Sequence, residues 1–140
     1  MIGAAKMGMD IRLAGPRPCW PQKERVDQAR AVARETGACI TLTENAEAAV
    51  RGCDFLYTDV WVSMGEEQER TRRLARLRRF QVTPELMGRA KPGAFFLHCL
   101  PAHRGEEVAA EVIDGPASAV WQQAANRLPT EQALLHLLIA

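Results

Sequence analysis

Short apolar segments with the composition of β-strands alternate along this chain with segments that have the periodicity of helices. The apolar segments are Ile11 to Ala14, Cys39 to Leu42, Phe55 to Thr58 and Ala94 to Leu97. Strands that alternate with helices are typical of a parallel sheet with right-handed crossovers. The sequence therefore predicts an α/β fold with a three-layer, doubly wound and mostly parallel sheet of the Rossmann-like kind.

Helical periodicity defines the connecting segments. Helices are expected from Lys23 to Thr36, from Glu44 to Val50 after an N-cap at Thr43, from Glu66 to Arg79, from Pro84 to a point before Lys91, from Glu106 to Val112, and from Arg127 to Ile139. In the helix at 23–36, Val26, Ala29 and Ala33 share one face and Gly37 ends the helix. A short helix that ends at Gly8 begins the chain, and Ala119 to Trp121 is expected to form a last short strand.

Composition narrows the class of protein. The chain has 140 residues, of which 47% are hydrophobic and 25% are charged, as in a soluble globular domain. Its formal net charge of +1 argues against a dominant nucleic-acid or acidic-lipid surface. No apolar run approaches the roughly 18 residues of a membrane span, and no signal peptide is visible. We therefore expect a cytoplasmic protein with a single domain over residues 1–140 and no membrane partner.

Reactive side chains follow the third and fourth strands. Ligands of doubly wound sheets bind beyond the carboxyl ends of the strands, and Asp59 and Cys99 stand at those ends. Asp59 can bind an ammonium group, and Ser63 adds a hydrogen-bond donor and acceptor. Alternatively, these two side chains cap the helix that begins at Glu66. The sequence alone leaves both interpretations open.

The segment from His98 to Pro101 also allows two interpretations. Cys99 is either a ligand-facing residue in a cleft or a buried thiol that ends a core strand. His98 is poorly placed to activate Cys99 as a nucleophile, because adjacent strand residues point to opposite faces. The four cysteines form no C-x-x-C pair and have no zinc-like spacing, so we expect no metal site.

Arginine side chains form two further candidate features. The arginines between Arg70 and Arg79 follow acidic residues at the start of their helix, which favours a solvated helix face with Glu66–Arg70 and Glu69–Arg73 pairs over a nucleic-acid patch. Arg127 is expected at the start of the last helix. An arginine there is either an anion-binding group or an ordinary exposed side chain.

Taken together, these motifs resemble those of the ornithine carbamoyltransferases. The similar segments are Lys6-Met7-Gly8-Met9-Asp10-Ile11-Arg12-Leu13, Tyr57-Thr58-Asp59-Val60-Trp61-Val62-Ser63-Met64-Gly65, His98-Cys99-Leu100-Pro101-Ala102-His103-Arg104-Gly105-Glu106-Glu107-Val108 and Asn126-Arg127. That family has a carbamoyl-phosphate domain and an ornithine-binding domain, and the likeness is to the second domain only. The resemblance implies transfer of the carbamoyl group of carbamoyl phosphate to L-ornithine, which gives L-citrulline and phosphate.

The resemblance also implies roles for individual residues. Asp59, Ser63 and Met64 would bind the amino-acid end of L-ornithine. The catalytic residue Cys99 would help to handle the proton of the attacking amine and, with Leu100 and Arg127, would contact carbamoyl phosphate. No metal or organic cofactor is implied, and the intact family forms homotrimers.

Three departures from the family pattern lead to a narrower expectation. The S-T-R-T and H-P-x-Q segments of the first domain are absent, the first central strand of the second domain is missing, and Ala125 stands where the family usually has Glu. We therefore expect a fragment, truncated at its N-terminus and inactive as an isolated chain. The alternatives are a non-enzymatic remnant that binds an amino acid or regulates a full-length carbamoyltransferase, and a nucleic-acid-binding protein that uses the arginine-rich helix.

Overall fold

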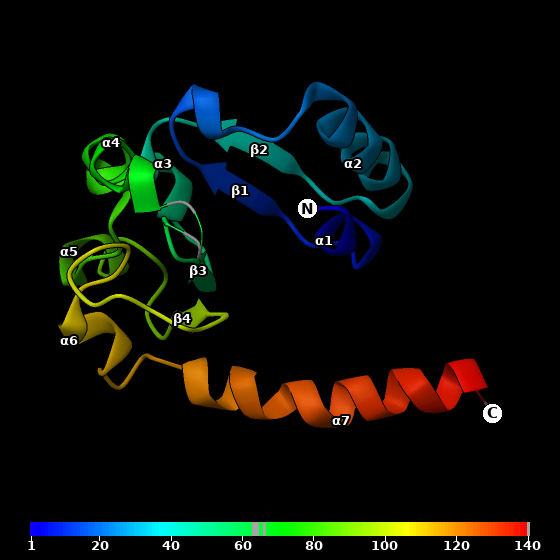
Figure 1. Cartoon of the computed structure of the whole chain (residues 1–140). Helices are drawn as coiled ribbons and strands as arrows, with labels where there is room; N and C mark the ends of the chain where they lie inside the picture. Colours follow the sequence, from blue (N-terminus) through cyan, green and yellow to red (C-terminus); the bar gives the residue numbers. More distant parts are fainter. Residues whose placement is uncertain (63–64, 66, 140) are drawn as a thin grey trace. The chain divides into compact units, whose positions relative to one another are not determined.

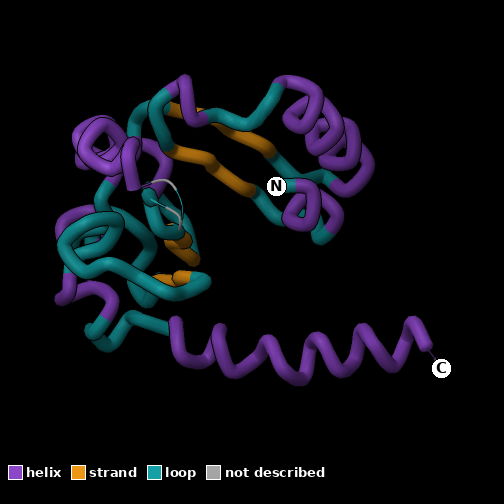
Figure 2. The backbone as a smooth tube through the Cα atoms, in the orientation of Figure 1, coloured by secondary structure: helices purple, strands orange, loops and turns teal. Residues whose placement is uncertain are grey.

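The computed structural model describes residues 1–62, 65 and 67–139. The chain divides into two compact units, Met1–Arg51 and Gly52–Ala140, and each combines a pair of strands with helices (Figure 1). Both pairs are parallel, so the predicted α/β class is confirmed. The hydrogen-bonded strands, orange in Figure 2, form two separate two-stranded sheets, one in each unit. The expectation of a single domain over residues 1–140 remains a prediction.

The first unit consists of a parallel strand pair and the helices that connect and flank its strands. Its elements are α1 (Ile2–Lys6), β1 (Ile11–Ala14), the 3-10 helix η1 (Arg17–Cys19), α2 (Lys23–Thr36), β2 (Ile40–Thr43) and α3 (Ala46–Val50). Small side chains of α1 and α2 form the core with the first residue of β2: Ala5, Ala29, Ala33 and Ile40. These small residues allow the helices to approach closely.

Helix α2 has the bounds that its periodicity predicts, and α3 has a different N-cap. Gly37 ends α2 with a left-handed φ of 80°, a conformation that glycine adopts without a Cβ clash. The N-cap of α3 is Asn45, whose side chain accepts a hydrogen bond from the Ala48 amide at 3.0 Å. The expectation of a Thr43 cap is wrong because Thr43 is still the last residue of β2.

The second unit carries the other parallel pair. Its elements are β3 (Phe55–Thr58), η2 (Glu67–Glu69), α4 (Arg70–Leu77), η3 (Arg78–Phe80), α5 (Pro84–Met87), β4 (Phe95–His98), α6 (Ala110–Ile113) and α7 (Val120–Ile139). In β4, Phe96 and His98 point to a fully buried face, whereas Phe95 is exposed. Further buried apolar side chains of this unit come from several segments: Phe80, Val82, Val108, Val112, Ile113 and Val120.

The segment before α6 differs from its prediction. A helix was expected from Glu106 to Val112, but α6 covers only Ala110–Ile113. The Val82 amide donates to the Glu107 carbonyl at 2.9 Å, and the Ala109 amide donates to the Val82 carbonyl at 2.9 Å. These bonds to a distant segment keep residues 107–109 out of the helix, so the helix begins later.

The last strand and the last helix also differ from their predictions. No strand forms at Ala119 to Trp121 in this described segment; Ser118 makes an isolated bridge to Phe96, and α7 begins at Val120. Arg127 therefore lies inside α7 and not at its start. The large apolar side chains of α7 are mostly exposed: Trp121, Leu128, Leu134, Leu135, Leu137, Leu138 and Ile139. Among the described helices, none has the length and apolar character required to cross a membrane.

Candidate functional site

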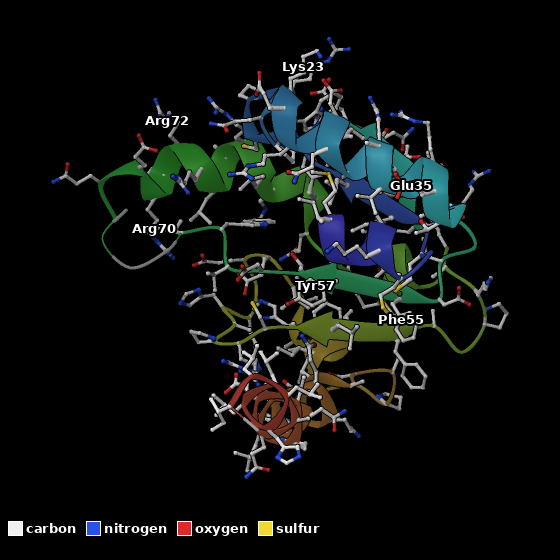
Figure 3. The ribbon with its side chains drawn as sticks, turned by 90° about the vertical axis from the view of Figure 1, so that its right-hand side faces the viewer. Lys23, Glu35, Phe55, Tyr57, Arg70 and Arg72 are labelled. Carbon is white, nitrogen blue, oxygen red and sulfur yellow. The ribbon has the colours of Figure 1, made fainter. Side chains whose placement is uncertain are left out.

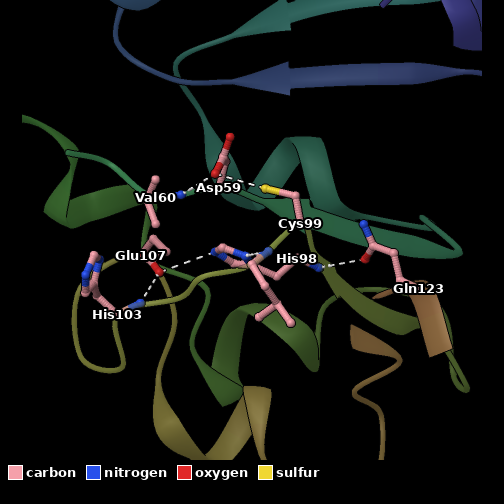
Figure 4. A network of polar contacts seen from close by, with 8 residues as sticks. Asp59, Val60, His98, Cys99, His103, Glu107 and Gln123 are labelled. Carbon is pink, nitrogen blue, oxygen red and sulfur yellow. Dashed lines mark hydrogen bonds and ion pairs between the residues drawn. The ribbon is translucent and has the colours of Figure 1, made fainter. Parts of the chain in front are cut away.

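The carboxyl ends of β3 and β4 bring a carboxylate and a thiol together. Thr58 and His98 are register partners, so Asp59 and Cys99 leave neighbouring strands at the same edge. The Cys99 thiol donates to Asp59 Oδ1 at 3.0 Å (Figure 4). The Val60 amide donates to the same oxygen at 2.7 Å, which orients the carboxylate. The expectation that these two strand tips lie together is confirmed.

The surroundings of Cys99 favour its protonated form. Burial raises the pKa of the Cys99 thiol above its ordinary value, and the Asp59 carboxylate raises it further. A hydrogen bond with Tyr57 acts in the opposite direction and lowers the pKa of Cys99. Reactive cysteines instead have a lowered pKa and sit in electropositive surroundings. The geometry therefore supports a neutral thiol at this edge, not a thiolate nucleophile.

A buried pair of polar side chains lies behind this edge. His98, the last residue of β4, and Glu107 are both fully buried. His98 Nε2 lies 3.3 Å from Glu107 Oε1, and that oxygen accepts a hydrogen bond from the His103 amide at 2.5 Å (Figure 4). Within the part of the chain that the structure describes, His98 Nε2 and Glu107 Oε2 have no hydrogen-bond partner. Burying polar atoms without hydrogen bonds costs free energy.

Leu100 has an unusual backbone conformation and a defined partner. Its φ of 57° is in the left-handed region, and its peptide bond to Pro101 is cis. The Leu100 amide donates to His98 Nδ1 at 2.8 Å. The amide of His98 donates to Gln123 Oε1 of α7 at 3.0 Å, which anchors the end of β4 (Figure 4). Side-chain acceptors thus hold two backbone amides on either side of Cys99.

The remaining expected site residues are Arg127, Ser63 and Met64. Arg127 lies inside α7, where it makes an ion pair with Glu131 at 3.3 Å and its side chain is 71% exposed. In the described residues it has no hydrogen bond or ion pair with Asp59, Cys99 or Leu100. Its expected position at a helix N-terminus is wrong because α7 begins at Val120. Ser63 and Met64 lie outside the described residues.

Arg70, Arg72 and Arg73 of α4 make ion pairs, as a solvated helix face predicts. Arg73 pairs with Glu69 at 3.3 Å, which confirms one expected pair. Arg70 pairs with Glu106, and its expected partner Glu66 lies outside the described residues. Figure 3 shows Arg70 and Arg72 projecting from this helix, and Arg72 pairs with Glu69 at 2.6 Å.

One group of side chains has the composition of a cation site. His103, Glu106 and Glu107 can bring their ligand atoms within 4.8 Å of one another. Glu106 is already paired with Arg70, and Glu107 Oε1 already accepts the His103 amide. Each of these two carboxylates therefore already has one partner within the described residues.

The sequence did not reveal the buried part of this site. The segment from His103 to Glu107 has the composition of a surface loop, and nothing in two adjacent glutamates indicates that only Glu107 is fully buried. Gln123 likewise carries no sequence signal, since its role depends on where α7 begins. The alternation of strands and helices predicts that Asp59 and Cys99 lie at one edge. The burial of Glu107 and the contact of Gln123 depend on distant segments of the chain, which no local pattern indicates.

Comparison with protein families and curated proteins gives a consistent result. The family model described as aspartate/ornithine carbamoyltransferase, Asp/Orn binding domain, matches residues 1–138. An ornithine carbamoyltransferase of Hyperthermus butylicus is 52% identical over 140 residues, which are 100% of this chain and 45% of that protein. The enzyme of Geobacillus stearothermophilus is 50% identical over 135 residues, which are 96% of this chain and 43% of that protein. The chain therefore spans less than half the length of these relatives.

Solved structures show the same similarity. An anabolic ornithine carbamoyltransferase from Campylobacter jejuni aligns with a TM-score of 0.92 at 37% identity, over 96% of this chain and 45% of that one. The ornithine carbamoyltransferase of Pyrococcus furiosus aligns with a TM-score of 0.88 at 45% identity, over 94% of this chain and 42% of that one. N-acetyl-L-ornithine transcarbamylase is also similar, with a TM-score of 0.83 at 29% identity.

Proposed function

Because this chain belongs to the aspartate/ornithine carbamoyltransferase family, we propose that it is the ornithine-binding half of an ornithine carbamoyltransferase. In the proposed reaction the δ-amino nitrogen of L-ornithine attacks the carbamoyl carbon of carbamoyl phosphate. A C–N bond forms, the C–O bond to phosphate breaks, and the amine releases a proton. The products are L-citrulline and phosphate, and the protein contributes mainly by positioning the reactants.

The contact between Asp59 and Cys99 carries this proposal. Asp59 is exposed at the carboxyl end of β3, and its Oδ1 atom already binds the Val60 amide and the Cys99 thiol. In the described part of the chain, its Oδ2 atom makes no hydrogen bond. A carboxylate oxygen that no described residue hydrogen-bonds complements the α-ammonium group of an amino acid. The Cys99 thiol donates to Asp59 Oδ1 at 3.0 Å, so it can pass its proton to that carboxylate as it accepts one from the attacking amine.

The other site residues extend the proposal to both substrates. Ser63 and Met64 bind the amino-acid end of ornithine together with Asp59. Leu100 contacts carbamoyl phosphate through its backbone beside Cys99. The guanidinium of Arg127 leaves its exposed ion pair with Glu131 and pairs with the phosphate group. None of these contacts involves a metal or an organic cofactor.

Because the chain matches less than half of its relatives' length, we do not expect the full reaction from it alone. It spans about 45% of its relative from Hyperthermus butylicus, and it lacks the S-T-R-T and H-P-x-Q segments that would bind carbamoyl phosphate. We therefore expect no citrulline formation by the chain alone. On the same family basis we expect a trimer in the intact enzyme and a cytoplasmic role in arginine metabolism.

Calorimetry with matched ligands tests the ornithine site. L-ornithine should bind, whereas N-acetyl-L-ornithine, which lacks the α-ammonium charge, and L-aspartate should bind at least about tenfold more weakly. Asp59→Asn should weaken ornithine binding by a similar factor. Asp54→Asn is the matched control, because Asp54 precedes β3 and pairs with Lys91 at 2.7 Å. Equal binding of all three ligands, or equal loss in both variants, would contradict the proposal.

A citrulline assay tests the expected inactivity. The chain is incubated with L-ornithine and carbamoyl phosphate, first alone and then with a full-length ornithine carbamoyltransferase such as that of Geobacillus stearothermophilus. Turnover by the chain alone near that of the full-length enzyme would refute the expectation. Altered turnover of the full-length enzyme would instead favour the regulatory alternative.

A further inference from the structure

Two contacts connect Glu107 to the backbone beside Cys99, and a third holds the Glu107 side chain itself. The Leu100 amide donates to His98 Nδ1 at 2.8 Å, and His98 Nε2 lies 3.3 Å from Glu107 Oε1. The same Glu107 oxygen accepts the His103 amide at 2.5 Å. His98 and Glu107 are fully buried, so water does not compete for these groups.

The hydrogen bond to Leu100 fixes the proton of His98. An imidazole nitrogen that accepts a hydrogen bond carries no proton, so Nδ1 is unprotonated and the ring proton of a neutral His98 is on Nε2. A carboxylate next to Nε2 favours this tautomer, because it attracts the N–H and repels the bare lone pair of the other tautomer. Glu107 thus selects the form of His98 that can hold the Leu100 amide.

Leu100 needs such support. Its φ of 57° is in the left-handed region, which a side chain with a Cβ atom adopts unfavourably. Such a conformation persists when surrounding contacts determine it. The Leu100 amide donates to the His98 side chain. The backbone amide of His98 in turn donates to Gln123 Oε1 at 3.0 Å.

The backbone of Glu107 is itself fixed. Its carbonyl accepts the Val82 amide at 2.9 Å, and the adjacent Val108 is fully buried and bridges to Val82. The carboxylate therefore projects from a rigid segment, which a positioning group requires.

We infer that Glu107 is a positioning residue: through the tautomer of His98 it fixes the Leu100 amide, and thereby the placement of Cys99 and Leu100 at the site. The effect on substrate rests on the proposed function, in which these two residues contact carbamoyl phosphate. The arrangement of Glu107, His98 and Leu100 does not depend on that function.

Nitrogen NMR of the imidazole side chains tests the inference in the full chain. In the unaltered protein the two-bond ¹H–¹⁵N pattern of His98 should show the Nε2–H tautomer. Glu107→Gln preserves the side-chain shape, but its amide can face Nε2 with either its oxygen or its NH₂ group. It should give a mixture of tautomers, and exchange of the Leu100 amide with solvent should become about tenfold faster. Glu106→Gln, one residue earlier, is the control and should leave both signals unchanged.

A rescue variant separates positioning from general stability. In His98→Asn the side-chain oxygen can accept the amide two residues later, and it has no tautomer to select. Adding Glu107→Gln to His98→Asn should therefore leave exchange of the Leu100 amide unchanged. The same acceleration in both backgrounds would show that Glu107 acts through the fold in general and would overturn the inference.

The outcomes separate this inference from the proposed function. An Nδ1–H tautomer in the unaltered protein, or no tautomer change in Glu107→Gln, overturns the inference with no variant of the ligand site needed. Absence of ornithine binding together with the expected tautomer changes contradicts the proposed function and leaves Glu107 as the residue that positions the Leu100 amide.

Discussion

The two strand pairs of this chain share a topology and differ at their carboxyl ends. Each pair consists of parallel four-residue strands in simple register, Ile11–Ala14 with Ile40–Thr43 and Phe55–Thr58 with Phe95–His98. Beyond β1 and β2 the chain forms an exposed ion pair between Arg17 and Glu44 at 3.2 Å. Beyond β3 and β4 it places Asp59 against Cys99, with His98 and Glu107 buried behind them.

The difference indicates that the carboxyl edge of a parallel sheet does not by itself make a functional site. Both edges present polar side chains, but only the β3–β4 edge is supported by fully buried polar groups among the described residues. Burying a carboxylate and an imidazole costs free energy that an exposed ion pair does not cost. We therefore regard the buried pair of His98 and Glu107 as the feature that distinguishes a functional site at the β3–β4 edge from an ordinary loop at the β1–β2 edge.

The largest expected effect comes from removing one member of the buried pair. Glu107→Ala should lower the free energy of unfolding of the second unit by about 3 kcal/mol, because it leaves a cavity and a buried imidazole without its neighbour. Urea unfolding followed by fluorescence of Trp61 and Trp121 measures this change.

The matched substitution at the other edge is Glu44→Ala. It removes a carboxylate whose side chain is 40% exposed in its ion pair with Arg17, so the loss should be below about 1 kcal/mol. Fluorescence of Trp20 reports on that unit. Equal losses in the two variants would remove the distinction between the two edges.

Removing a helix N-cap side chain should lower the free energy of unfolding by an intermediate amount that is the same in both units. The Asn45 side chain caps α3 by accepting from Ala48, and Thr83 caps α5 by accepting from the Leu86 amide at 3.3 Å. Asn45→Ala and Thr83→Ala should each cost about 1 kcal/mol in urea unfolding. A much larger cost for Thr83→Ala would show that local contacts, and not only the buried pair, separate the two units.

Some of the site residues could be placed from the sequence alone, and others could not. Strand alternation was enough to place Asp59 and Cys99 at one edge, because parallel neighbours end on the same side. The position of Arg127 was not predictable, because Val120 and Trp121 have strand-like side chains and Pro129 suits the first turn of a helix, yet α7 runs from Val120 through Pro129. The burial of Glu107 depends on its pairing with Val82, which no local pattern contains.

Thiol reactivity should give the smallest effect. Since burial and Asp59 raise the pKa of Cys99, its alkylation by iodoacetamide should be slower at neutral pH than that of the exposed Cys19 and Cys39, and should rise only at more alkaline pH. Asp59→Asn should lower the pKa of Cys99 and speed its alkylation by less than about tenfold.

Tyr57→Phe is the opposing variant for this prediction. It removes the hydrogen bond that lowers the pKa of Cys99, so alkylation should become slower. Mass spectrometry of peptides resolves each cysteine separately. Acceleration by Tyr57→Phe, or no change with Asp59→Asn, would contradict the described surroundings of the thiol.

An NMR titration of the full chain with L-ornithine shows which sheet edge binds the amino acid, and we expect binding at the β3–β4 edge and not at the β1–β2 edge. We predict saturable shifts of the Asp59 and Cys99 amides that disappear in Asp59→Asn, while the Gly15 and Glu44 amides stay unchanged. Shifts confined to Gly15 and Glu44, or no saturable shift at Asp59 and Cys99, would contradict the account.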